Sequence, residues 1–175
     1  YVSKCLPYAT HRSGDEVFPL QHQFHVVHAE PRILALDWPP PGFHVLFVSA
    51  HAPHSACKDV EEWWKRLQKI LCTCGKGKII CLGIDANISV PPNVEHVSGP
   101  LALVKKHDKF VSSMIDTCVH ARLHVPVTFE NLSAEPFPQP TFVGKGHAKV
   151  SSYVLLPYNL RIIPSSAKVQ VKIHT

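Results

Sequence analysis

The sequence predicts a single domain of mixed α/β (α+β) class, and three observations support this prediction. The chain has 175 residues, of which 45% are hydrophobic and only 18% charged, so it can bury one sizeable core. Short apolar segments bounded by proline and glycine recur along most of the chain, as expected of strands. Two longer segments have helical spacing, and the clearer one lies between two predicted strands.

The N-terminal half divides at its prolines. Residues 1–22 show no clear period and are predicted to be an irregular lead-in to a partial domain over residues 23–175. Three strands are predicted next, at 23–29, 32–37 and 43–50. Pro31 separates the first two strands. The run Pro39–Gly42 forces a turn between the second and third, which predicts an antiparallel hairpin with a long loop.

The clearest helix is predicted over residues 56–71, with Ser55 as its N-cap. Its apolar residues follow the i, i+3, i+4, i+7 pattern: Val60, Trp63, Trp64, Leu67, Ile70 and Leu71. We therefore interpret the tryptophan pair as core rather than as a ligand platform. The exposed face offers two i, i+4 ion pairs, Glu61–Lys65 and Glu62–Arg66.

The sequence patterns that predict the remaining elements are less clear. A strand at 78–84 completes a strand–helix–strand unit, and a second helix is predicted over 101–119. Further strands are predicted at 125–129, 140–143, 150–156 and 168–173.

Charge and cysteine usage limit the function classes only loosely. The formal charge of +5 is compatible with an anionic partner such as nucleic acid but does not identify one. The six cysteines form no C-x-x-C pair and no regular framework, which predicts a reducing, intracellular setting, cytoplasmic or nuclear. No signal peptide or membrane-spanning run is visible, and a chain that starts at Tyr1 is expected to be a fragment or an excised domain.

Thirteen histidines raise the question of a zinc site. His22, His25 and His28 recur at every third residue. In a regular strand His25 and His28 would point to opposite faces, whereas zinc needs convergent ligands. We therefore expect these histidines to be surface imidazoles. A zinc-binding protein is kept as one hypothesis for the function.

The segment Cys81–Asn87 carries the strongest functional signal. A buried strand ends there in Asp85 and Asn87, two residues apart, which places both side chains on the same side of the chain. Such a polar tip suits a site that polarises water and holds a phosphate oxygen. The alternative is a simple turn, because Gly, Asp and Asn are all turn formers.

Three stretches in a fixed order form a recognisable set. They are Val48–His54, Gly83–Asn87 and Ser151–Pro157, the last preceded by Pro140-Thr141-Phe142. In this order and spacing the chain resembles the endonuclease/exonuclease/phosphatase superfamily, and most of all the endonuclease domains of non-long-terminal-repeat retrotransposons. The resemblance implies a four-layer sandwich of two packed, mostly antiparallel sheets with outer helices, here truncated at both ends.

The resemblance also implies metal-assisted hydrolysis of a phosphate ester, usually with Mg²⁺, on DNA or another phosphate ester. Asp85 would orient or deprotonate the attacking water, and Asn87 would hold the phosphate or the water. His51 would face the phosphate. His54 and Ser152 would be substrate-binding positions.

Three parts of the family pattern are changed or missing. Ser152 stands where the family has an aspartate, and the terminal Asp-His motif has no counterpart beyond His174, which no aspartate precedes. The metal-binding glutamate has only Glu16 and Glu30 as candidates, by order alone. The sequence therefore predicts the family's architecture with impaired hydrolysis. The second hypothesis is a non-catalytic module that binds nucleic acid or protein on the same fold.

Overall fold

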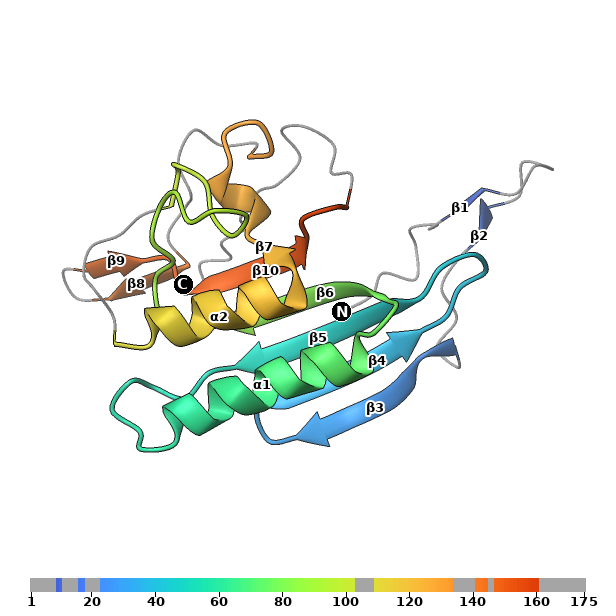
Figure 1. Ribbon diagram of the computed structural model, residues 1–175, viewed down its shortest axis with the longest axis horizontal. Coiled ribbons are helices and arrows are strands. Elements are labelled where there is room, and N and C mark those ends of the chain that lie inside the picture. Colours follow the sequence, from blue (N-terminus) through green and yellow to red (C-terminus); the bar gives the residue numbers. More distant parts are fainter. Residues whose placement is uncertain are drawn as a thin grey trace.

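A single six-stranded sheet forms the centre of the molecule, with strand order β3-β4-β5-β6-β10-β7 (Figure 1). The computed structural model describes residues 9–10, 16–17, 23–102, 109–133, 141–144 and 147–160. The strands of the sheet are β3 (His25–Glu30), β4 (Ile33–Trp38), β5 (Val45–His51), β6 (Ile79–Asp85), β7 (Leu123–His124) and β10 (Ser152–Pro157). Two short ladders, β1 (Ala9–Thr10) with β2 (Glu16–Val17) and β8 (Phe142–Gly144) with β9 (His147–Lys149), accompany it.

The strand directions confirm the predicted class and the predicted connections. All neighbours in the sheet are antiparallel except β5 and β6, which run parallel. The parallel pair is joined by helix α1 (Val60–Cys74), as the strand–helix–strand pattern required. The fold is α+β, with a mixed and mostly antiparallel sheet and helices. The predicted hairpin between the second and third strands is present as β4–β5.

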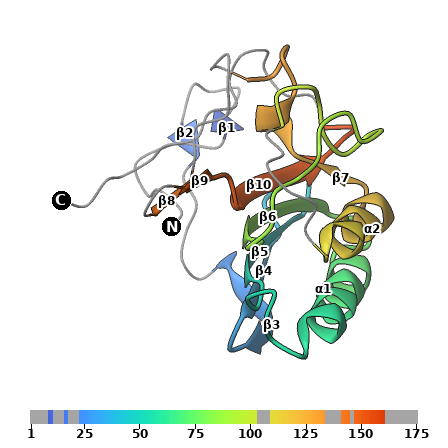
Figure 2. The same cartoon turned by 90° about the vertical axis from the view of Figure 1, so that its left-hand side faces the viewer.

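The two helices, α1 and α2 (Val111–Ala121), cover one face of the sheet (Figure 2). Alternate residues of the central strands point to this face and form the core with the helices, including Ala50, Ile84 and Tyr153. Trp63 and Trp64 on α1 are 4% and 3% exposed, which confirms that the tryptophan pair belongs to the core.

Helix α1 begins later than the sequence predicted. Its N-cap is Asp59, not Ser55, and no side chain caps it. Residues 55–59 form turns instead, one of them closed by the Cys57 N–H donating to the His54 carbonyl at 2.8 Å. The helix also ends later than predicted, at Cys74 rather than at 71. The N–H of Gly75 still bonds to Leu71 O, and the next glycine, Gly77, adopts a φ of +73°.

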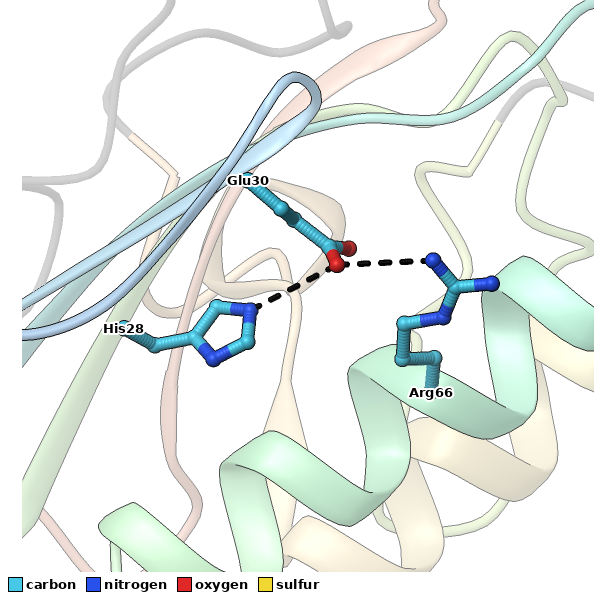
Figure 3. A network of polar contacts seen from close by, with 3 residues as sticks. All are labelled: His28, Glu30 and Arg66. Atoms are coloured by element: carbon cyan, nitrogen blue, oxygen red, sulfur yellow. Dashed lines mark hydrogen bonds and ion pairs between the residues drawn. The ribbon is translucent and has the colours of Figure 1, made fainter.

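Only one of the two predicted ion pairs on α1 forms. Lys65 lies 3.0 Å from Glu61. Arg66 does not pair with Glu62; it reaches across to Glu30 at the end of β3, 3.4 Å away, and Glu30 also lies 3.6 Å from His28 (Figure 3). The Glu30 side chain is much less exposed than that of Glu62, so the pairing with Glu30 is less screened by solvent.

A β-bulge corrects the expectation for the histidines of β3. Val26 pairs with Leu36, but His28 pairs with Ala35, so Val27 is an extra residue that shifts the alternation. His25 and His28 therefore have register partners, Asp37 and Ala35, on the same face of β4. The prediction that they point to opposite faces is wrong, because it assumed an unbroken period of two.

Two predictions in the C-terminal half were also wrong in detail. Residues 125–129 do not form a strand; a 3₁₀ helix spans Pro126–Thr128, because proline lacks the N–H that a strand ladder needs and suits the start of a helix. The second helix begins at Val111 rather than at 101, with turns at 101 and at 109–110. The predicted strand at 168–173 lies outside the described residues.

The buried His124 on β7 is expected to make the stability of the folded protein depend on pH. It is 5% exposed, neither ring nitrogen has a hydrogen-bond partner, and burial lowers the pKa of His124 from its ordinary value of 6.5. A lowered pKa favours the neutral ring in the folded state. Its contribution is therefore complete above the ordinary pKa and is lost as the pH falls below it.

The test compares urea unfolding of the wild type and His124→Leu at about pH 7.5 and about pH 5.5, on either side of the ordinary histidine pKa. The variant should be more stable by about 1 kcal/mol at the higher pH, because two unsatisfied nitrogens are removed. It should also lose less stability on acidification. Equal losses in both proteins would show that His124 is not responsible.

Candidate functional site

Three of the predicted site residues lie in one row across three adjacent strands. His51, the last residue of β5, is the register partner of Asp85, the last residue of β6. Asp85 is in turn the register partner of Ser152, the first residue of β10. Neighbouring strands are about 4.8 Å apart, so imidazole, carboxylate and hydroxyl are side by side at one end of the sheet.

The row points away from the helices. The residues adjacent to it in each strand, Ala50, Ile84 and Tyr153, are buried in the core under α1 and α2. Because successive side chains of a strand alternate, His51, Asp85 and Ser152 share the opposite face. Asp85 and Ser152 are half-buried and His51 is exposed, so solvent and solutes can reach the row.

Asp85 and Asn87 form a turn, which was the alternative interpretation of this segment from the sequence. The carboxylate Oδ1 of Asp85 accepts a hydrogen bond from the backbone N–H of Asn87 at 3.2 Å. Asn87 has a φ of +55°, in the left-handed region that asparagine tolerates better than most residues. Its side-chain Nδ2 donates to the carbonyl of Ala52, 2.8 Å away. The turn thus connects the ends of β6 and β5.

His54 does not belong to the row. It lies exposed in the loop after β5, three residues beyond His51, and its Nδ1 accepts the N–H of Ala56 at 3.3 Å. Its side chain is thereby engaged within its own loop.

Thr141, in the Pro-Thr-Phe stretch that precedes β10, has a role that no sequence motif indicates. The Thr141 hydroxyl accepts the backbone N–H groups of Ser151 and Ser152, at 2.9 and 3.0 Å. The carbonyl of Ser151 accepts the N–H of Ala86 at 2.7 Å. These bonds fix the start of β10 beside the end of β6 and hold Ser152 in register. Thr141 lies inside the strand predicted at 140–143, and a threonine in a predicted strand gives no sequence signal of this role.

Of the two candidate metal-binding glutamates, Glu30 lies away from the row. Glu30 pairs with Ile33, a core residue on the helix-covered face, and its carboxylate contacts Arg66. Glu30 is thus on the face of the sheet opposite to the row. Glu16 lies on β2, in the short ladder with β1. Within the described ranges, no three His, Cys, Asp or Glu side chains come close enough together to hold a metal ion.

The oxygen donors at the row nevertheless suit Mg²⁺. Magnesium binds through one or two carboxylates together with waters and substrate phosphates, and it prefers oxygen to nitrogen. Asp85 offers the carboxylate, and Asn87, in the same hydrogen-bonded turn, carries a side-chain amide group. The imidazole of His51 is a poor ligand for this ion and is better suited to donating a hydrogen bond.

Among the helices that the structure describes, none is long and apolar enough to cross a membrane.

Comparison with known proteins identifies the fold. No family model matches the sequence. No curated protein matches it either. Among solved structures, the endonuclease domain of TRAS1, a telomere-specific non-LTR retrotransposon, aligns with a TM-score of 0.52 and 14% identity, over 87% of this chain and 65% of that domain. At such low identity the likeness shows the fold alone.

Two further solved structures align at lower TM-scores. An endonuclease/exonuclease/phosphatase family protein from Leptotrichia buccalis aligns with a TM-score of 0.45 and 13% identity, over 76% of this chain and 47% of that one. A mannosyl-6-phosphatase from Bacteroides thetaiotaomicron aligns with a TM-score of 0.41 and 13% identity, over 78% and 54%. This chain therefore spans about two thirds to one half of the structures that it matches. The resemblance inferred from the sequence motifs is confirmed at the level of the fold.

Proposed function

We propose that this chain, which has the fold of the endonuclease/exonuclease/phosphatase superfamily, is a phosphodiester hydrolase-like domain that acts on DNA. Its site is the row of His51, Asp85 and Ser152 together with Asn87. The observation that carries the proposal is the register of β5, β6 and β10, which brings residues from three separate motifs to one edge of the sheet. A set of unrelated turn and loop residues would not be expected to meet in one row.

The roles follow from the chemistry of each group. Asp85 accepts a proton from the attacking water, or orients that water in line with the bond to be broken. His51 donates a hydrogen bond to a phosphoryl oxygen, where negative charge increases in the transition state. Asn87 holds the phosphate or the water from the turn beside Asp85. Mg²⁺ bound by Asp85 and Asn87 would supply further positive charge.

Because position 152 is a serine, we expect this hydrolysis to be impaired. It occupies the row position beside Asp85, where the family pattern has an aspartate, and a hydroxyl brings no negative charge. Removing the carboxylate that orients a catalytic histidine costs about 10⁴ in rate in serine proteases. We therefore expect weak hydrolysis or a pseudoenzyme.

A non-catalytic module that binds nucleic acid is the second candidate. The backbone N–H of Asn87 is bonded to Asp85 and its Nδ2 to Ala52, so part of its donor capacity serves the turn. The net charge of +5 favours association with a polyanion. This candidate keeps the same surface and requires no bond to be broken. An intracellular setting, cytoplasmic or nuclear, remains a prediction for either function.

Plasmid nicking with added Mg²⁺ separates the two candidates, with Asp85→Ala as the control. Wild-type nicking should be weak but above that of the variant. Equal activities, with both proteins still binding DNA, would favour the binding module. Absence of both binding and nicking would reject both candidates.

A further inference from the structure

The hydroxyl of Tyr153 joins two backbone segments beside the row. Tyr153 follows Ser152 on β10, and its ring is 6% exposed in the core. The hydroxyl accepts the N–H of Val90 at 3.1 Å. It lies 2.7 Å from the carbonyl of Val150 and 3.2 Å from that of Ile88, to either of which it can donate its proton.

These partners belong to the two segments that carry site residues. Residues 86–90 follow β6 and include Asn87, and Val150 comes just before Ser151 and Ser152. The hydroxyl of Ser89 also donates to the Val150 carbonyl at 3.1 Å. The connection between β6 and β10 therefore continues beyond the strand ends, through side chains rather than through ladder bonds.

The core itself does not require this hydroxyl. A phenyl ring would fill the same volume among the buried residues, whereas a buried hydroxyl is stable only when it is hydrogen-bonded. Burial raises the pKa of Tyr153 well above its usual range, so the group stays protonated and remains a donor. Its three backbone neighbours all lie on the loop and strand end next to the row.

We propose that Tyr153 is a positioning residue, whose hydroxyl fixes the 86–90 loop and thereby the side chain of Asn87 relative to Asp85 and Ser152. The inference rests on the proposed function only in assuming that Asn87 acts at the site. The geometry that it concerns can be measured without any activity.

The test is nuclear magnetic resonance of the full chain with Tyr153→Phe. The backbone amide of Val90 should exchange with solvent about tenfold faster, because it loses its acceptor. The side-chain amide signals of Asn87 should shift, because its bond to Ala52 depends on the position of the loop. Tyr158→Phe is the matched control, since Tyr158 is 46% exposed.

The outcomes distinguish positioning from simple stabilisation. A merely structural role would lower the unfolding midpoint and leave the Asn87 signals unchanged, and that result would overturn the proposal. Equal effects of Tyr153→Phe and Tyr158→Phe would do so too. If Tyr153→Phe does not fold, Ser89→Ala removes one bond of the same connection and should produce a smaller shift at Asn87; no shift there would count against the proposal.

Titration with a short DNA duplex in Mg²⁺ buffer keeps the two proposals separate. If the wild type does not bind, the proposed function fails, while the Val90 and Asn87 measurements still decide the role of Tyr153. If it binds, Tyr153→Phe should weaken binding about tenfold and Tyr158→Phe should not.

Discussion

Trp64→Ala is expected to lower the free energy of unfolding by about 3–5 kcal/mol, as large core truncations do. Trp64 is 3% exposed on α1, and its ring packs edge-to-face against that of Trp63 with centroids 5.0 Å apart. Removing the indole deletes apolar contact and leaves a cavity between helix and sheet. Since small domains have about 5–15 kcal/mol of stability in total, much of this protein's stability would be lost.

Urea unfolding followed by far-ultraviolet circular dichroism measures the effect. Lys69→Ala is the control, because it changes an exposed residue of the same helix. The control should shift the free energy of unfolding by about 0.5 kcal/mol or less. If Trp64→Ala had as small an effect, α1 would not be packed on the sheet as described.

Ser152→Asp is expected to raise Mg²⁺-dependent plasmid nicking by about tenfold to a hundredfold. This gain is smaller than the full rate enhancement that a well-positioned acid or base group supplies. The substitution places a second carboxylate next to Asp85 in the row, at the start of β10. The gain stays limited because residues that act together do not contribute additively, and the terminal Asp-His motif is not restored.

Ser152→Asn provides the matched control for shape without charge. It should leave nicking at the wild-type level, and the double variant Asp85→Ala with Ser152→Asp should fall to background. If Ser152→Asn raised nicking as much as Ser152→Asp, the charge of the restored carboxylate would not be the cause. If neither variant changed it, Ser152 would not limit the reaction.

Local patterns predicted the elements of the sheet well, because hydrophobic periodicity and proline placement act within a few residues. The strand predicted at 78–84 is β6, Ile79–Asp85, and the helix predicted at 56–71 is α1, Val60–Cys74, with both ends a few residues later. The bulge in β3 escaped prediction because an extra residue is specified by pairing with β4, not by the Val-Val sequence itself. Pro126 gave a usable signal against a strand at 125–129, which the apolar run obscured.

The residues of the candidate site came from the sequence motifs, but their arrangement in space did not. The spacing of Asp85 and Asn87 placed them together, and the structure adds that their proximity is a hydrogen-bonded turn. The row with His51 and Ser152 depends on register between strands far apart in sequence, which no local pattern specifies. The position of Glu30 on the helix-covered face likewise follows from tertiary pairing with Arg66.

Mn²⁺ titration followed by nuclear magnetic resonance tests the shared site most directly, because Mn²⁺ accepts the same oxygen ligands as Mg²⁺ and broadens nearby signals. The account predicts that signals of Asp85, Asn87 and Ser152 broaden first, that Glu30 and Arg66 on the other face are spared, and that Asp85→Asn abolishes the effect. Broadening that begins at Glu30, or that persists in Asp85→Asn, would contradict the assignment of the row as the functional site.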